Sequence, residues 1–189
     1  MKLSRDRKRG FLGDDRGVAA IEFAFVAPIF CLLLVGAIDL GGALYVQFKL
    51  DTAVTAGANF AQVNASSVNS TSGQTLATNI ATIVESSQGS SWANDTVVVN
   101  DGPTTTVSSG TATTSGTASN ANSCYCPSGT VSSFTWGAAT TCGTSCGSNA
   151  GYAGKFVTIT ATQTYTPIFS NYGVVKNDTI TATSVVQVQ

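Results

Sequence analysis

The sequence predicts an α+β protein: a long N-terminal transmembrane helix that continues into an amphipathic helix, followed by a small antiparallel β-rich exported domain. Three observations predict this fold class. The chain is apolar over residues 18–45, which is long enough to cross a bilayer. Apolar residues then recur at helical spacing as far as residue 90. Within residues 91–189, apolar residues alternate with threonines over Lys155–Tyr165 and Thr179–Val188 in a way typical of half-buried strands.

Composition favours an exported protein over a cytosolic enzyme. Charged residues make up only 10% of the chain, and Ser, Thr, Asn and Gly supply its polarity. Most of the basic residues lie in the first sixteen positions, so no basic patch for nucleic acid follows them. The sequence contains no histidine, which excludes histidine-dependent catalysis and histidine-based metal sites. We therefore expect no nucleic-acid partner, no cofactor and no metal.

The membrane segment has a charge-free core from Phe23 to Ile38. This core spans about 24 Å as a helix, and its flanks extend it past the ~30 Å hydrocarbon thickness. Pro28 is expected to kink the helix or to open one backbone hydrogen bond. Because positive charge stays in the cytoplasm, the basic leader, residues 1–17, is predicted to lie inside and the chain from about residue 46 outside. An ordinary secretory signal is the alternative, but its apolar region is typically only about 7–15 residues.

The run RGVAAIEF, residues 16–23, resembles the prepilin-peptidase site of type IV pilins and pseudopilins. In those proteins a basic leader ends in glycine, and a glutamate is the fifth residue of the mature chain. The resemblance implies cleavage between Gly17 and Val18, which makes Glu22 the fifth mature residue. A carboxylate near the bilayer centre costs about 2.5–3.5 kcal/mol, and less towards the edge, so an intramembrane acid suggests a partner. The resemblance implies that this partner is the freed α-amine of Val18 on a neighbouring subunit. The alternative is that Glu22 is solvated at the headgroup boundary.

The similarity extends further along the helix. GVAAIEFA at residues 17–24, Pro28, DLGG at residues 39–42 and Tyr45 together resemble the TadE/TadG-like family of tight-adherence (Tad) pilus systems. In that family the segment that leaves the membrane reads E-L-G-R-x-x-Y. Here Asp39 replaces the usual Glu, and a glycine replaces a common Arg. Asp39 is therefore a candidate second intramembrane contact, or a polar cap at the outer end of the span.

This resemblance implies a place and a set of partners. The chain is expected in the bacterial inner membrane, with its N-terminus in the cytoplasm and its C-terminal region in the periplasm, in the pilus or at the cell surface. The implied partners are the prepilin peptidase, the Tad inner-membrane assembly platform and other pilins or pseudopilins.

Residues 46–90 are predicted to be helical outside the membrane. One face of the first helix carries small and apolar residues suited to close packing, although a glycine within it lowers helix propensity. These residues are Leu50, Ala53, Val54, Gly57, Ala58 and Ala61. A second helix is predicted over Gln74–Glu85, after a Ser/Asn-rich loop at Asn64–Gly73.

Residues 91–189 are predicted to be β-rich. Thr96–Val99 reads as a strand that ends in an Asn-Asp-Gly-Pro turn. Residues 104–123 are rich in Thr, Ser and Gly, and we expect them to form a flexible loop. Lys155–Tyr165 and Thr179–Val188 read as antiparallel strands, which a long connection joins.

Four cysteines form a cluster in this region, and Cys31 lies apart in the apolar stretch as a small membrane residue. The cluster can form two disulfides or hold zinc through four thiolates. An oxidising compartment and the absence of C-x₂-C spacing favour disulfides. Cysteines that are two positions apart seldom bond to each other. This leaves Cys124–Cys142 with Cys126–Cys146, or the crossed pairing.

Two functions remain in view. The first is a minor pilin or pseudopilin that takes part in Tad/Flp pilus assembly and surface attachment. The second is an uncleaved, single-pass membrane-anchored binding or adhesion module in the periplasm. An enzyme is not expected, because the carboxylates outside the membrane show no paired spacing and no nucleophile–base motif is present.

Overall fold

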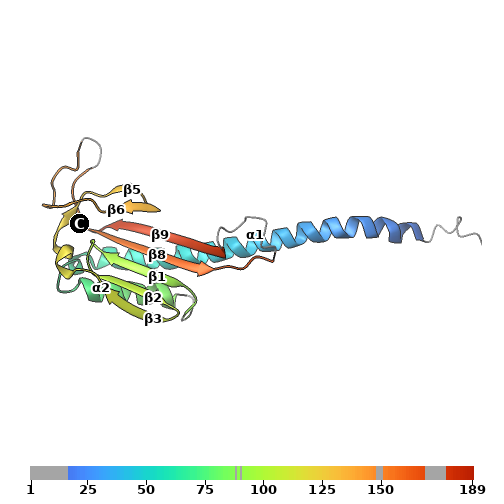
Figure 1. Cartoon of the computed structure of the whole chain (residues 1–189), viewed down its shortest axis with the longest axis horizontal. Coiled ribbons are helices and arrows are strands. Elements are labelled where there is room, and N and C mark those ends of the chain that lie inside the picture. The colour runs from blue at the N-terminus through green and yellow to red at the C-terminus, as the bar shows by residue number, and fades with distance from the viewer. Residues whose placement is uncertain (1–16, 88, 90, 148–150, 169–177) are drawn as a thin grey trace, which may run out of the picture.

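A helical stalk carries an α+β head in this protein (Figure 1). The computed structural model describes residues 17–87, 89, 91–147, 151–168 and 178–189. The leader up to residue 16 and most of the predicted 167–177 connection lie outside the described residues. The α+β prediction is confirmed.

One helix, α1 (Val18–Val63), forms the stalk with its residues 18–38 and part of the head with its residues 39–63. The helix continues unbroken through Pro28. Its predicted apolar face is confirmed, because all six residues of that face are buried. After a short 3-10 turn, η3 (Ala65–Ser67), the second helix α2 (Gly73–Ser86) runs close to its predicted limits. Gly57 lies on the buried face of α1, and a methyl group there would lie 3.0 Å from Ile80 Cγ2 of α2.

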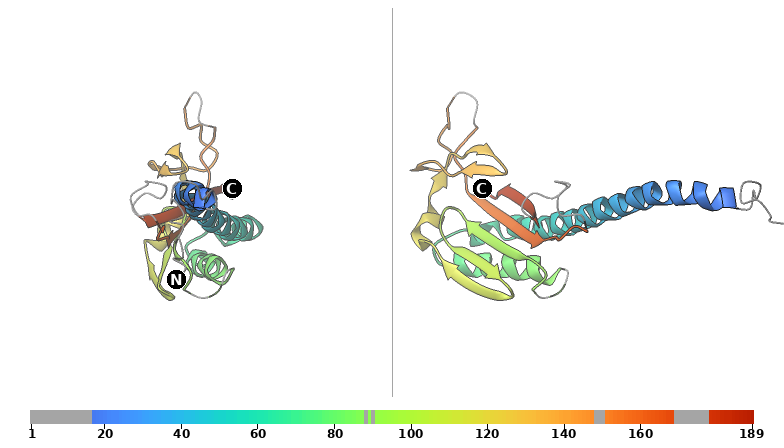
Figure 2. Two further views of the ribbon diagram at one scale, coloured as in Figure 1. Left: turned by 90° about the vertical axis from the view of Figure 1, so that its right-hand side faces the viewer. Right: turned by 45° about the vertical axis from the view of Figure 1, so that its right-hand side comes forward.

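A five-stranded antiparallel sheet covers the two helices, in the order β3-β2-β1-β8-β9. Its strands are β1 (Asn94–Val99), β2 (Thr104–Ser108), β3 (Thr111–Ser115), β8 (Phe156–Thr164) and β9 (Thr179–Gln187). The helices α1 and α2 pack on one face of the sheet, and Figure 2 shows the other face free of helices. Alternate residues of the strands, such as Val97 and Ile159, are fully buried against the helices.

The three predicted strands are confirmed as β1, β8 and β9, whereas the prediction of a flexible loop at residues 104–123 is wrong. That segment forms the hairpin β2–β3 and a 3-10 helix, η4 (Ala118–Asn122). Thr105 and Val107 are buried against α2, and Gln74 Nε2 donates a hydrogen bond to Thr105 Oγ1 at 3.0 Å. Composition misled here because threonine is a good strand former even where a segment has few large apolar residues.

The predicted turn at Asn100–Pro103 joins β1 to β2, with positive φ at Asn100 and Asp101 as a type I′ hairpin turn requires. Asn100 also connects distant parts of the head, and its side chain is fully buried. Its Oδ1 accepts a hydrogen bond from the Phe156 amide at 3.1 Å, and its Nδ2 donates to the Ser123 carbonyl at 2.6 Å. These bonds hold η4 and β8 together at the end of the sheet.

A cysteine-bearing lobe lies at the end of the head away from the start of α1 (Figure 1). It contains β4 (Cys124–Tyr125) paired with β7 (Ala139–Thr140), and the hairpin of β5 (Ser128–Thr130) and β6 (Ser133–Thr135). Disulfides join Cys124 to Cys142 and Cys126 to Cys146, which is one of the two pairings that the sequence left open. Cys31 is free and exposed on the stalk.

Candidate functional site

The first part of α1 is a bare apolar helix. Its most apolar 18-residue window has a mean hydropathy of 2.6, and no residue of that window is buried by the rest of the chain. No residue from Val18 to Ile38 is buried, and burial begins at Asp39. At about 1.5 Å per residue, this bare segment is about 31 Å long, close to the ~30 Å of a bilayer's hydrocarbon core. By length and composition, α1 can therefore cross a membrane.

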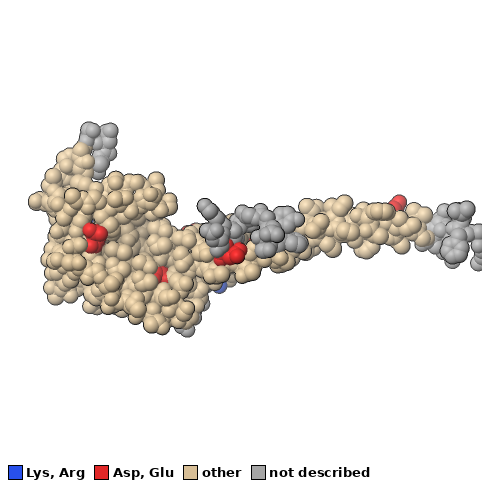
Figure 3. Space-filling view, viewed as in Figure 1, with Lys and Arg blue, Asp and Glu red and all other residues tan. Residues whose placement is uncertain are grey.

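The predicted cleavage and assembly residues lie at the start of this helix. Gly17 is the residue before α1, and Val18 is its first residue. Glu22 is the only charged residue between Val18 and Ile38. On the face drawn in Figure 3, an acidic spot lies near the start of the described helix. The Glu22 side chain is exposed and makes no hydrogen bond or ion pair with any residue that the structure describes. Among the described residues, the carboxylate therefore faces solvent.

Asp39 marks the point at which the head begins to contact the helix. Its side chain is buried, with only 4% of its surface exposed. The backbone carbonyl of Asp39 accepts a hydrogen bond from Tyr165 Oη at 2.9 Å, and its Oδ1 accepts one from the Ile168 amide at 2.8 Å. Asp39 thus joins the segment after β8 to α1, inside the span predicted as residues 18–45.

Gly42 lies one helical turn further on and completes this junction. A methyl group at this position would overlap the hydroxyl group of Tyr165. The glycine that replaces a common arginine of the resembled family therefore makes room for the tyrosine. Sequence reasoning missed Tyr165 as a junction residue, since it is 126 residues away from Asp39 along the chain.

The predicted site residues thus lie in three separate places. Glu22 is at the start of the stalk, Asp39 is at the junction, and the four disulfide cysteines are in the distal lobe. Among the residues that the structure describes, no group of three or more acidic, cysteine or histidine side chains is arranged to hold a metal ion. The cysteine thiolates that could have bound zinc are paired in disulfides.

The structure thus places the chain in the class of α+β proteins with one membrane-capable N-terminal helix that continues without a break into the head. Residues 17–59 match the model of the family described as TadE-like protein, so the resemblance inferred from the sequence is confirmed for this segment. The match covers the bare helix, the junction with the head and most of the buried face of α1. The sheet and the disulfide lobe lie beyond it. No curated protein and no solved structure matches the chain.

Proposed function

We propose that this chain is a TadE/TadG-type minor pilin, or pseudopilin, that takes part in assembly of a Tad/Flp pilus and in surface attachment. One observation carries the proposal: the TadE-like segment is a single helix, bare for about 31 Å and then built into the core of the head. Such a helix can hold the protein in the inner membrane and later pack among the helices of other pilins. The head remains attached to it throughout.

Processing by a prepilin peptidase between Gly17 and Val18 would prepare the chain for assembly. The glycine before the helix lets a peptidase approach the backbone closely. Cleavage would leave a positive α-amine on Val18, four residues before the exposed Glu22. In an apolar environment, that amine and the Glu22 carboxylate of a neighbouring subunit would attract each other and set the axial register.

The proposed topology follows from charge. The basic leader stays in the cytoplasm, the helix crosses the bacterial inner membrane, and the head lies in the periplasm until it joins the pilus. Lys49 Nζ lies 4.8 Å from the centre of the Tyr45 ring on the head side of the bare segment. An aromatic ring and a basic side chain at this level suit the outer membrane interface. The inner-membrane assembly platform and other pilins are the proposed partners.

Substitution of Glu22 tests the assembly step. The Glu22→Gln variant keeps a side chain of the same shape and should still reach the membrane and be processed. We expect its amount in sheared pili to fall at least about tenfold, because the buried α-amine of Val18 on the neighbouring subunit would lose its carboxylate partner. Asp51→Asn is the matched control, since Asp51 is an exposed acid on the same helix within the head. Pili that contain normal amounts of the Glu22→Gln variant would contradict the proposed pairing.

A further inference from the structure

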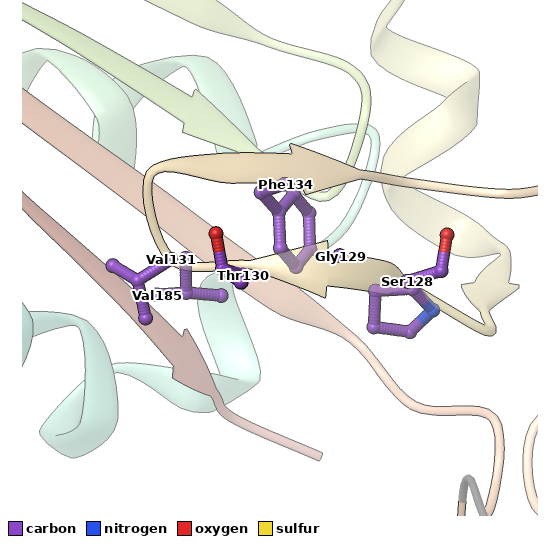
Figure 4. A pocket seen from close by; sticks show the side chains of 7 residues that line it. Ser128, Gly129, Thr130, Val131, Phe134 and Val185 are labelled. Atoms are coloured by element: carbon purple, nitrogen blue, oxygen red, sulfur yellow. The ribbon is translucent and has the colours of Figure 1, made fainter.

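The hairpin β5–β6 forms a shallow pocket of about 220 Å³ over the edge strand β9. Figure 4 shows Val131 of the hairpin and Val185 of β9 together at one end of the pocket, with the Phe134 ring further along the hairpin. The pocket is lined by Pro127, Ser128, Gly129, Thr130, Val131, Phe134 and Val185. It is smaller than the ~300–1,000 Å³ typical of sites for drug-sized ligands. One small ring would fill it.

Two kinds of surface meet in this pocket. Phe134, Val131 and Val185 offer apolar contacts, whereas Ser128 and Thr130 bring hydroxyl groups. Thr130 Oγ1 shares a hydrogen bond of 3.2 Å with Ser132 Oγ, in which either hydroxyl can be the donor. Since a hydroxyl group both donates and accepts, Thr130 can also bond to a ligand. A hydroxyl-bearing ring with one apolar face would match both surfaces.

The pocket opens onto a face of threonines. Val185 pairs with Thr158, so it points to the face of the sheet that lies opposite the helices. On this face one row crosses all five strands through paired threonines: Thr183, Thr160, Thr96, Thr106 and Thr113. Neighbouring strands lie about 4.8 Å apart, and residues on the same face about 6.7 Å apart along each strand. The face therefore presents a regular array of hydroxyl and methyl groups.

The lobe and this face carry almost no charge. Residues 102–154 contain no Asp, Glu, Lys or Arg, and residues 155–189 contain only Lys155, Lys176 and Asp178. Lys155 points away into the head, where its Nζ donates a hydrogen bond to the Val68 carbonyl at 2.8 Å. Figure 3 shows one face of the head as largely uncharged, with small acidic spots. Because residues 102–154 offer neither a cation nor an anion to pair with a charged ligand, the lobe suits a neutral one.

We propose that the distal lobe binds a neutral polysaccharide, with one sugar ring in the β5–β6 pocket and adjoining rings on the threonine face. The C–H face of a sugar would pack on Phe134 and the two valines, and its hydroxyls would bond to Ser128 and Thr130. Two disulfides and the contact of Phe134 with Phe156, 6.2 Å between ring centres, hold the pocket in place before a ligand arrives. Its position at the far end of the head suits contact with an external surface.

Binding can be measured on the purified full chain in detergent micelles. The probes are neutral hexasaccharides of glucose, galactose, mannose and N-acetylglucosamine, with a sulfated heparin hexasaccharide as the anionic control. Saturation-transfer NMR and titration calorimetry give contact and affinity. We expect at least one neutral probe to bind and the sulfated one not to bind. Absence of binding by all four neutral probes, or equal binding of the sulfated one, would overturn the proposal.

Three variants locate the site. Phe134→Ala and Val131→Asp should each weaken binding at least about tenfold, and Thr130→Val, which changes only the hydroxyl, should weaken it less. Thr75→Val is the matched control, because Thr75 is exposed on α2, on the opposite side of the sheet. Unchanged disulfides and an unchanged melting temperature show that a variant is folded. Binding that all three variants retain would also overturn the proposal, as would a concentration-dependent dimer that seats a second copy in the pocket.

This inference deepens the attachment role proposed above and rests on it only for its biological setting. Failure of sugar binding would leave processing and pilus assembly untouched. Failure of assembly would leave sugar binding by the purified chain measurable. The two outcomes are therefore distinguishable.

Discussion

Asp95 places a carboxyl group on the helix-facing side of β1, where 97% of its surface is covered. Neither carboxylate oxygen has a hydrogen-bond partner among the described residues. Burial raises the pKa of Asp95 from 3.8 to about 7, and the nearby Glu85 carboxylate adds to the rise. The Val107 amide offsets part of it, although its geometry falls short of a hydrogen bond. Below about pH 7, the head therefore holds a mostly protonated acid in its core.

The sign of the resulting pH dependence is fixed. Between about pH 4 and pH 7 the unfolded chain releases the Asp95 proton while the folded chain keeps it, so the free energy of unfolding falls as pH rises. We expect Asp95 to lower that free energy by roughly 2–4 kcal/mol between pH 4 and pH 8. Urea unfolding of the wild type and of Asp95→Asn at both pH values measures this contribution.

In the Asp95→Asn variant this part of the pH dependence should disappear, and at pH 8 the variant should be more stable than the wild type. Asp51→Asn, at an exposed position of α1, is the control and should leave the dependence unchanged. Equal pH profiles for the wild type and Asp95→Asn would show that Asp95 ionises normally in the folded head.

At the scale of elements, the contact of α1 with α2 and β8 depends on Gly57. A methyl group at this position would lie 3.0 Å from Ile80 Cγ2, 3.1 Å from Val84 Cγ2 and 3.2 Å from Ile159 Cδ1. These distances are tighter than ordinary van der Waals contact, so the neighbouring side chains would have to move. The glycine that weakens the helix locally allows close packing in the core.

A pair of glycine substitutions tests this balance. Gly41→Ala should stabilise α1 by up to about 1 kcal/mol, because a methyl group there meets no atom within 4 Å. Gly57→Ala gains the same helix propensity but strains the core, so we expect it to be at least about 1 kcal/mol less stable than Gly41→Ala. Thermal unfolding of both variants in one detergent gives the comparison. A Gly57→Ala variant as stable as Gly41→Ala would show that the core has spare room.

Local pattern predicted most of the elements and missed those that depend on distant contacts. The apolar face of α1 could be predicted because burial of one helix side leaves a 3.6-residue period. The strands β8 and β9 could be predicted because they alternate between a buried face and a polar one. The hairpin β2–β3 could not, because its burial comes from α2 and its composition resembles that of a loop.

The same limit applies to single residues of the site. Gly17 and Glu22 could be selected because the segment around them resembles a known motif. The Asp39–Tyr165 contact and the hydrogen bonds of Asn100 leave no local signal, since their partners are far away in sequence. The turn at Asn100–Pro103 could be predicted from its residues, whereas the role of the buried Asn100 side chain could not.

At the scale of the whole molecule, the junction between the stalk and the head attaches the end of β8 to α1. Tyr165 Oη and the Ile168 amide both bond to Asp39, and Gly42 makes room for the tyrosine ring. The segment after β8 is thereby fixed to α1 at the end of its bare part. A pull on the stalk would reach the sheet through this contact as well as through the core.

Removal of one hydroxyl group tests the junction. We expect Tyr165→Phe to raise amide hydrogen exchange in residues 165–168 roughly tenfold, because one hydrogen bond of about 1 kcal/mol is lost. Tyr152→Phe is the matched control, since Tyr152 is an exposed tyrosine in the distal lobe. Exchange that stays unchanged in Tyr165→Phe would show that the Ile168 bond and packing hold the segment alone.

The mature N-terminus gives the most direct test of the proposed pilin role. Mass spectrometry of the protein from cells with and without the prepilin peptidase would identify it. A chain that begins at Val18 only when the peptidase is present is the predicted result. A chain that still begins at Met1 in cells with the peptidase would contradict it and would indicate an uncleaved, membrane-anchored module.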